Sequence, residues 1–446
     1  MPIAHRKCRP AGTRSLSGSP AQASRPGLLR FGSPGLLLTC TLFLVALAAA
    51  AQAPRPTTDL KPTVILISID GFRCDFLEKY SAPNLHNLAL SGVRAESMQP
   101  SFPTYTFPNH YTLVTGLYPA HHGIVANEMY DPSFDATFVY KEPQAKEGRW
   151  WGGEPIWVTA DRQGQKTATL YWPGSAAPIK GMWPDYWEPF EPKVTPEQRA
   201  EKVLAWLDLP AERRPAFLAL YFDQVDHEGH EGGPDSPQVR DAIRNVDAAI
   251  GRLLEGLRQR GIENRVHIIV VSDHGMTPTP PNQVVFIDDY VDLRKVRAVT
   301  RAQFLTFWPA MGEIDAIFAR LQNVPHARVY RRGDVPSRWH YSGNARIGPI
   351  LLLADEGWTI TDREYAKSHE LKHGGHGYDN NLSSMQAIFI AHGPAFKQGT
   401  KLSAFPNVDV YNLMAYLLHL KPAHNDGTLE VFRPVLVGKP AKAVSH

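Results

Sequence analysis

The sequence predicts an α/β protein with a mostly parallel central sheet flanked by helices. The 446-residue chain has 43% hydrophobic and 20% charged residues, which is an ordinary globular composition. Three apolar runs without alternation predict strands that are buried on both faces, as parallel strands are. These runs are residues 64–69, 217–222 and 266–271.

The segment between the second and third runs predicts a helix. Its apolar residues recur at three-to-four spacing from 239 to 257, Ser236-Pro237 gives a helix start, and Gly261 gives a stop. Strand, helix and strand in this order form a βαβ unit. A fourth strand at 387–391 and a helix around 408–420 complete the α/β layout.

The N-terminal segment has the layout of a signal peptide. Residues 1–53 contain six basic residues and no acidic one, with an apolar run at 35–50 and the small-x-small triplet Ala51-Gln52-Ala53. The run is shorter than the ~20 residues of a membrane-spanning helix, so an uncleaved anchor is the less favoured alternative. We therefore expect export, to a bacterial periplasm or as a secreted protein, without a stable membrane anchor once the leader is cleaved.

Charge and cysteine content narrow the function further. Without the leader, 41 basic and 44 acidic residues remain, so net charge gives no support for binding a nucleic-acid duplex. Cys74 is the one cysteine of three outside the leader, which excludes an intrachain disulfide in the mature protein.

Segment boundaries follow from composition. We expect a signal peptide at 1–53, a lead-in at 54–61, a catalytic domain at 62–425 and a C-terminal tail at 426–446. Residues from about 292 to 360 contain strands of their own and few metal-binding residue types, which predicts a small inserted α+β subdomain. Plain continuation of the main sheet explains these strands equally well.

Acidic residues follow three of the predicted strands. Asp70 and Asp223 come directly after their runs, and the Asp273-His274 pair follows the third run after Ser272. The carboxyl ends of parallel strands meet at one edge, where α/β proteins bind ligands. One aspartate there means little, but three with a histidine indicate a metal site.

Histidines with two possible registers lie near these carboxylates. Asp223 and His227 are four residues apart, which places both on one side of a helical turn. Asp226 and His230 have the same spacing, so spacing alone does not choose between the two pairs. A solvated polar loop without a metal explains this segment equally well. His376 lies between glycines that let it approach a metal; a histidine-rich surface loop including His369 and His373 is the alternative. Oxygen and nitrogen ligands without thiolates favour Zn²⁺.

A hydroxyl-rich segment supplies a candidate nucleophile. Thr106 lies among prolines just ahead of a helix-like stretch, whose N-terminus favours anions. Metal coordination would activate its hydroxyl without a histidine base. Taken alone, such a segment is more often a proline-rich turn.

Five motifs in one order carry a resemblance to a known family. They are Asp70-Gly71, Thr106-Phe107-Pro108-Asn109-His110, Asp223 with His227, Asp273-His274-Gly275-Met276 and Gly375-His376-Gly377-Tyr378. The chain resembles the nucleotide pyrophosphatase/phosphodiesterase family of the alkaline phosphatase superfamily, as a bacterial single-domain member, over roughly residues 62–425. The resemblance implies an alkaline-phosphatase-like fold.

The resemblance also implies two zinc ions per chain and their ligands. One ion would be held by Asp223, His227 and His376, which selects that register over Asp226 and His230. The other would be held by Asp70, Asp273, His274 and the Thr106 oxygen. Thr106 would be phosphorylated transiently and then released by water, in a two-metal displacement.

Substrate-binding residues follow from the same resemblance. Asn127 matches the position whose amide holds a phosphate oxygen together with the backbone N–H after the nucleophile. Phe107 offers a face for a nucleobase, and Tyr186 and Trp187 lie in a tryptophan-rich stretch that could form a substrate wall.

The implied activity is release of nucleoside 5′-monophosphates from phosphodiester or pyrophosphate bonds in nucleotides. Choline phospholipids are an alternative substrate, because similar aromatic loops occur in family members that act on them. A phosphomonoesterase usually adds an arginine or a third metal, and a sulfatase needs a Cys or Ser nucleophile motif that is absent here. An exported metal-binding pseudoenzyme is the non-enzyme alternative, against which the intact candidate nucleophile and ligands argue.

Overall fold

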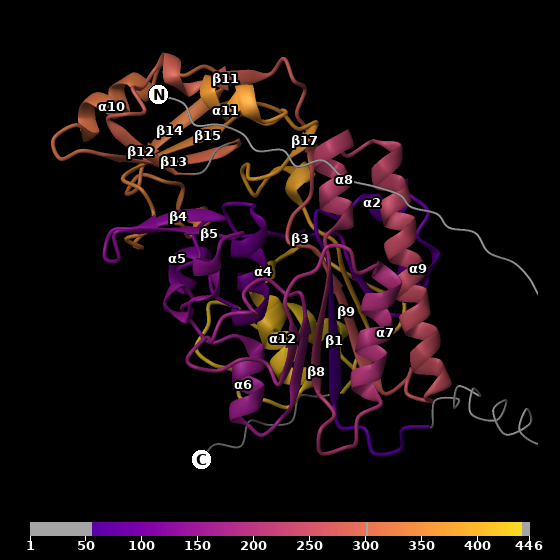
Figure 1. Ribbon diagram of the computed structural model, residues 1–446. Helices are drawn as coiled ribbons and strands as arrows, with labels where there is room; N and C mark the ends of the chain where they lie inside the picture. Colours follow the sequence, from indigo (N-terminus) through magenta and orange to yellow (C-terminus); the bar gives the residue numbers. More distant parts are fainter. Residues whose placement is uncertain (1–55, 300–301, 439–446) are drawn as a thin grey trace, which may run out of the picture. The chain divides into compact units, whose positions relative to one another are not determined.

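The computed structural model describes residues 56–299 and 302–438, which belong to one compact unit (Figure 1). The expected signal peptide at 1–53 lies outside the described residues, as do the start of the lead-in and the end of the C-terminal tail. Among the described residues, no helix has the length and apolar character needed to cross a membrane.

An eight-stranded sheet forms the centre, in the order β19-β2-β18-β9-β1-β8-β6-β7. Its middle strands are β9 (Val266–Val271), β1 (Thr63–Ile69) and β8 (Phe217–Phe222), which run parallel. The others are β19 (Thr400–Leu402), β2 (Val93–Ala95), β18 (Phe389–His392), β6 (Thr167–Leu170) and β7 (Tyr186–Glu188). Only β18 runs antiparallel to its neighbours, which confirms the predicted mostly parallel sheet.

Both faces of the sheet are covered, as the apolar runs require. Ile65, Ile67 and Ile69 point into one core, and Val64 and Leu66 point into the other, because successive strand residues face opposite sides. The first core includes helices α3 (Pro83–Ser91), α7 (Pro196–Leu207) and α9 (Pro237–Gln259), and the second includes α4 (Thr106–Thr115), α6 (Ile156–Arg162) and α12 (Val410–Leu417) (Figure 1).

The residues from 292 to 360 form a separate sheet with an apolar core of its own. It is antiparallel, in the order β12 (Val296–Val299), β13 (Phe304–Pro309), β15 (Ile350–Ala354), β14 (Ala327–Arg331), with α10 (Ile314–Leu321) packed against it. This sheet shares no strand with the central one, so these residues do not extend the main sheet.

Shorter elements complete the fold. They are α2 (Phe76–Lys79), β3 (Met98–Gln99), α5 (Pro119–His122), β4 (Glu128–Asp131), β5 (Ala136–Val139), α8 (Gln224–Gly232), β10 (Thr277–Pro278), β11 (Val284–Phe286), β16 (Thr359–Thr361), α11 (Arg363–Ser368), β17 (Gly374–Gly375) and β20 (Phe405–Pro406).

A buried carboxylate next to α12 makes stability depend on pH. Asp409 accepts a hydrogen bond from the Thr428 backbone N–H at 2.7 Å, and burial raises its pKa to about 6. The folded state therefore binds this proton more tightly than the unfolded state, whose pKa is about 3.9. The free energy of unfolding accordingly falls as pH rises from about 4 to about 6 and stays lower above that range.

We therefore expect Asp409→Asn to stabilise the protein at pH 8 by about 1–2 kcal/mol, because the amide oxygen can still accept the Thr428 hydrogen bond. The advantage should vanish near pH 4, where the native carboxyl is protonated. Thermal unfolding followed by circular dichroism at both pH values measures the difference. Equal melting temperatures for the two proteins at pH 8 would contradict the expectation.

Candidate active site

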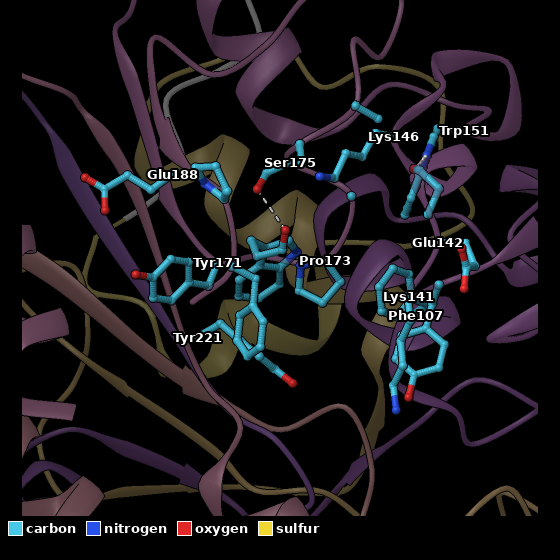
Figure 2. A pocket seen from close by; sticks show the side chains of 18 residues that line it. Phe107, Lys141, Glu142, Lys146, Trp151, Tyr171, Pro173, Ser175, Glu188 and Tyr221 are labelled. Carbon is cyan, nitrogen blue, oxygen red and sulfur yellow. Dashed lines mark hydrogen bonds between the residues drawn. The ribbon is translucent and has the colours of Figure 1, made fainter. Parts of the chain in front are cut away.

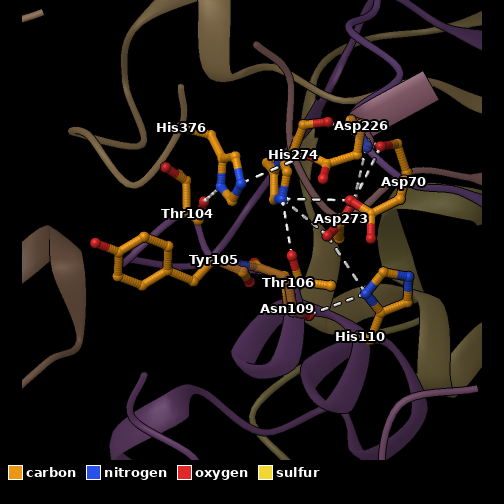
Figure 3. Close-up of polar contacts among 12 residues, drawn as sticks. Asp70, Thr104, Tyr105, Thr106, Asn109, His110, Asp226, Asp273, His274 and His376 are labelled. Atoms are coloured by element: carbon orange, nitrogen blue, oxygen red, sulfur yellow. Dashed lines mark hydrogen bonds and ion pairs between the residues drawn. The ribbon is translucent and has the colours of Figure 1, made fainter. Parts of the chain in front are cut away.

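The carboxyl ends of the middle strands meet at one edge of the sheet. Ile69 lies opposite Phe222 and Ser68 lies opposite Val271, so β1, β8 and β9 end at nearly the same level. Asp70 follows β1, and Asp273 follows β9 after one residue. Figure 3 shows these carboxylates together with Thr106, which starts α4 on the neighbouring segment.

The first group of side chains, here called the Thr106 cluster, consists of Asp70, Thr106, Asp273 and His274. The His274 Nε2 lies 3.0 Å from Asp273 Oδ2, 3.5 Å from Asp70 Oδ1 and 3.4 Å from Thr106 Oγ1. Both aspartates and His274 are buried, while Thr106 is half-buried. The four side chains predicted to share one ion therefore lie together.

The second group, here called the Asp226 cluster, consists of Asp226, His230 and His376. The Asp226 carboxylate lies 3.5 Å from His376 Nε2 and 3.4 Å from His230 Nε2, and the two imidazole Nε2 atoms are 3.1 Å apart. His376 also stacks on His274, with ring centroids 3.6 Å apart, so the two clusters are in direct contact.

The structure does not bring Asp223 and His227, the expected pair of the second group, together with His376. Asp223 is the N-cap residue of α8, and its Oδ1 accepts a hydrogen bond from Arg199 Nη1 at 2.7 Å. His227 is exposed. The helical face that meets the site carries Asp226 and His230, a pair with the same i, i+4 spacing three positions further along.

Glycines explain why α8 approaches the site on that face. A β-carbon on Gly71 would lie 2.9 Å from the Asp226 Cα, and Gly71 has φ +69°, so only glycine fits there comfortably. On the other side, a β-carbon on Gly374 would lie 2.1 Å from the Gly229 carbonyl oxygen. These contacts bring α8 between β1 and the segment that carries His376.

The donor set fits divalent metal ions. The ligand atoms of Asp70, Asp273 and His274 lie within 4.8 Å of one another, as do those of Asp226, His274 and His376. One carboxylate oxygen on each of the three aspartates is buried and accepts no hydrogen bond. Buried anionic oxygens are costly unless a cation or donor satisfies them, so these atoms are available to metals.

The pKa shifts of the buried aspartates also favour a bound cation. Burial and the neighbouring carboxylates of Asp273 and Asp226 raise the pKa of Asp70 well above its usual range. Burial opposes ionisation of Asp273 too, but His274 and His110 outweigh it and hold the pKa of Asp273 well below its usual range. A group of buried carboxylates this close together gains most from added positive charge.

Two residues beside the clusters, Tyr221 and His110, were given no role from the sequence. The Tyr221 hydroxyl donates to Asp70 Oδ2 at 2.6 Å, from within β8. The His110 ring lies between Ser68 Oγ, at 2.8 Å, and the Thr106 carbonyl oxygen, at 2.9 Å. A polar ring near the end of an apolar strand, and a histidine four residues after the candidate nucleophile, were the signals available.

Comparison with known proteins identifies the family. Residues 64–379 match the family described as type I phosphodiesterase / nucleotide pyrophosphatase. The chain belongs to this family. An uncharacterized pyrophosphatase/phosphodiesterase of Schizosaccharomyces pombe is 41% identical over 401 residues, which are 85% of this chain and 81% of that protein.

Animal members of the type I phosphodiesterase family are similar at the same level. Ectonucleotide pyrophosphatase/phosphodiesterase family member 3 of Bos taurus is 41% identical over 395 residues, 85% of this chain but 45% of the relative. The chain thus spans about half the length of several curated relatives. Murine ectonucleotide pyrophosphatase/phosphodiesterase 5 superposes with a TM-score of 0.81 at 36% identity, over 84% of this chain and all of that one, which confirms the predicted fold.

In the present protein, a cavity of about 400 Å³, here called the aromatic cavity, lies next to the Thr106 cluster. Figure 2 shows Phe107 at one side and Tyr171 and Tyr221 at the other. The other ring-bearing residues that line it are Tyr140, Trp151, Trp172, Pro173, Pro189 and Phe190. Lys141, Glu142, Lys146 and Glu188 also line it.

The expected substrate residues divide between two places. Phe107 lines the aromatic cavity, and its backbone N–H donates to Asn127 Oδ1 at 2.9 Å, so the amide and the N–H expected to share a phosphate oxygen are adjacent. Tyr186 and Trp187 do not line the cavity. They lie on β7, the edge strand, where the Tyr186 hydroxyl donates to the Arg213 carbonyl oxygen. The segment that contains β7 lines the cavity only with the residues that follow Trp187, from Glu188 to Phe190.

Proposed function

We propose that the protein hydrolyses phosphodiester and pyrophosphate bonds in nucleotides and releases nucleoside 5′-monophosphates, with Thr106 as nucleophile. The observation that carries this proposal is the position of the Thr106 hydroxyl. It lies at the N-terminus of α4, 3.4 Å from His274, between a carboxylate–imidazole site and an aromatic cavity of nucleotide size.

Two zinc ions per chain complete the site in this proposal. Asp70, Asp273, His274 and the Thr106 oxygen hold one ion, and Asp226, His230 and His376 hold the other. When bound, such a pair of ions supplies positive charge that favours loss of the Thr106 proton and offsets the charge that develops on the leaving oxygen. Buried nitrogen and oxygen donors without a thiolate support zinc over softer metals.

The chain's own groups position the reacting atoms. The Thr106 Oγ forms a bond to phosphorus as the bond from phosphorus to the leaving oxygen breaks, so the hydroxyl proton leaves Thr106 and the leaving oxygen gains a proton. The Phe107 N–H donates to Asn127 Oδ1 and so orients the Asn127 amide, whose N–H₂ would donate to a non-bridging oxygen. Water then cleaves the phosphorus–Oγ bond, which restores the hydroxyl and releases the monophosphate.

Relatives support the nucleotide and the nucleophile. Murine ectonucleotide pyrophosphatase/phosphodiesterase 5 has a solved complex with AMP, in a variant described as inactive in which one threonine is replaced by alanine. Rings on opposite sides of the aromatic cavity, such as Phe107 and Tyr171 (Figure 2), suit a planar base. The names of the relatives, which include ecto-enzymes and venom phosphodiesterases, support export of this protein as well.

A second candidate substrate is a choline phosphodiester. The aromatic cavity is lined by several rings, including Tyr140, Trp151 and Tyr171, and such rings attract quaternary ammonium groups. Lys141 and Lys146 would repel a cationic headgroup, but Glu142 and Glu188 line the same cavity and would attract it, so the charge of the lining does not separate the two substrates. We place the nucleotide first because a similar protein, murine ectonucleotide pyrophosphatase/phosphodiesterase 5, has a solved complex with AMP.

Three nitrophenyl substrates test the proposal. The zinc-loaded protein should cleave the nitrophenyl ester of thymidine monophosphate with kcat/KM at least about tenfold above those for nitrophenyl phosphate and nitrophenyl phosphorylcholine, because only the first fills the aromatic cavity with a base. Nitrophenol release is followed by absorbance. Preference for the choline ester would move the protein to phospholipids, preference for the monoester would overturn the diesterase assignment, and no turnover of any would favour a metal-binding pseudoenzyme.

A further inference from the structure

One connection of the inserted subdomain contacts the active-site loops. Residues 339 to 346, here called the clamp segment, lie between β14 and β15. They touch two parts of the site, which are the chain just ahead of Thr106 and the loop that ends at Asn127. The Thr106 and Asp226 clusters contain no residue of the inserted subdomain, so any role that it has in the reaction must pass through such contacts.

The loop that leads to Asn127 is buried without regular structure. Residues 123 to 126 are buried, and they lie between α5 and β4, outside any helix or strand. Their backbone carbonyls therefore need donors from other segments. Asn127 itself is half-buried, and its Oδ1 accepts a hydrogen bond from the Phe107 N–H at 2.9 Å. The position of the Asn127 amide thus depends on what holds this loop.

Three side chains of the clamp segment donate to carbonyl oxygens along α5 and this loop. They are Asn344 to Ala120 at 2.7 Å, Arg346 to Gly123 at 2.8 Å and Tyr341 to Val125 at 2.8 Å. The approach is close, because a β-carbon on Gly123 would lie 2.9 Å from Arg346 Nη1. Gly123 also has φ +83°, which favours glycine. The loop therefore obtains from the clamp segment the donors that it does not supply itself.

Arg346 connects the segments on both sides of Asn127. Its Nε donates to Asp131 Oδ2 at 2.6 Å, on β4, and the two side chains are only 12% and 6% exposed. Its Nη1 also donates to the Trp150 carbonyl oxygen at 2.6 Å, next to Trp151 in the wall of the aromatic cavity. A planar guanidinium with several fixed donors can make these contacts at once, whereas an ammonium group cannot.

The clamp segment also packs against the chain ahead of the candidate nucleophile. Trp339 is buried and stacks on Phe102, with ring centroids 3.9 Å apart and planes at 7°. The Tyr341 ring lies edge-on to Phe102, with centroids 5.2 Å apart. Phe102 is four residues before Thr106. One segment therefore contacts both the lead-in to Thr106 and the loop that ends at Asn127.

A buried histidine fixes the same loop to α4. The Ile124 N–H donates to His122 Nδ1 at 3.1 Å, and His122 Nε2 lies 3.0 Å from Thr112 Oγ1 on α4. Burial lowers the pKa of His122 to about 3, so the ring is neutral and its Nε2–H donates to Thr112. The loop is thus held between the helix that starts at Thr106 and the clamp segment.

We propose that the clamp segment is a positioning element of the active site, which holds the Asn127 amide at its distance from Thr106 chiefly through Arg346 and Tyr341. The inserted subdomain then supports turnover without supplying a residue to either cluster. This inference rests on the proposed function, in which the Asn127 amide donates to a phosphate oxygen.

A double-mutant cycle between Arg346 and Asn127 tests the proposal. Arg346→Met should lower kcat for the thymidine nitrophenyl ester about tenfold and change KM by less than about twofold, because an oxyanion donor acts mainly in the transition state. In the Asn127→Ala background the same substitution should lower kcat by less than about twofold, because no amide remains to be displaced. Tyr341→Phe, which removes one donor and keeps the ring, should show the same dependence on Asn127 with a smaller loss.

Two further variants control for folding. Arg346→Met leaves the Asp131 carboxylate buried without its cation, so the double variant Asp131→Asn/Arg346→Met, which removes both charges, should show the same loss of kcat in a folded protein. Arg331→Met is the matched control, because Arg331 pairs with Asp315 at 2.7 Å on the inserted subdomain and lies outside the clamp segment; it should keep the native kcat. Circular dichroism and zinc content are measured on each preparation.

The outcomes separate this inference from the proposed function. An equal loss of kcat from Arg346→Met with and without the Asn127 amide would overturn the inference and leave the proposed function intact. Native kcat in folded Arg346→Met and Tyr341→Phe proteins would overturn it as well. Native kcat in Asn127→Ala alone would instead overturn the role of Asn127 in the proposed function.

Discussion

Replacing Thr106 with alanine should lower kcat/KM for the thymidine nitrophenyl ester by at least about 10³-fold. The reaction needs an oxygen at this position to form the bond to phosphorus, and alanine has none. The substitution removes few atoms from a half-buried helix start, so the fold and the carboxylate–imidazole clusters should persist. Steady-state kinetics and zinc content, measured on the same preparation, report the two quantities separately.

The control for this variant is Thr106→Ser, which keeps the hydroxyl. It should retain activity within about tenfold of the native protein, because the nucleophile differs only by a methyl group. Near-native activity in Thr106→Ala, with zinc content preserved, would show that another group or water attacks phosphorus.

Replacing His230 with alanine should halve the zinc content per chain and lower kcat/KM by about 100-fold or more. His230 contributes its Nε2 to the Asp226 cluster, where it lies 3.1 Å from His376 Nε2 and 3.4 Å from Asp226 Oδ2. Its loss leaves one carboxylate and one imidazole to hold that ion. Metal analysis after gel filtration measures the zinc content directly.

His227→Ala is the matched control, since it removes the same side chain from the same helix. His227 is exposed and belongs to neither cluster, so zinc content and kcat/KM should stay at native values. The opposite pattern, with zinc lost in His227→Ala and kept in His230→Ala, would restore the register inferred from the sequence.

The fold followed from local patterns in the sequence. Apolar runs such as residues 64–69 can only be buried on both faces, and a run of that kind separated from the next by an amphipathic helix specifies a βαβ unit. Ser236 and Gly261 also marked the ends of α9 to within two residues. The antiparallel direction of β18 was not visible, because an apolar strand reads the same in either direction.

The edge of the sheet that carries the site also followed from the sequence. Asp70 comes directly after β1, and Asp273 and His274 follow β9 after one residue, so the predicted strands also placed these side chains. The role of Thr106 could not be predicted from its own segment, because a threonine among prolines is uninformative until the helix that it starts is known. The ordered set of motifs supplied that information, and it indicated the family to which the chain belongs.

Only the tertiary structure decided which face of α8 meets the site. Two pairs four residues apart fit the same helix, and spacing cannot distinguish them. The choice depends on the close approach of α8 to Gly71 and Gly374, and on Arg199, which holds Asp223 elsewhere. These partners lie far apart in the sequence, so the information is in the packing.

The wall of the aromatic cavity was likewise decided by tertiary structure. Aromatic residues are abundant between 150 and 190, and composition alone could not separate Phe190, which lines the aromatic cavity, from Tyr186, which packs at the edge strand. The sequence thus determined the fold class and the chemistry of the strand ends, because both depend on neighbours along the chain. The ligand register and the substrate surfaces depend on contacts between distant segments, which only the folded chain brings together.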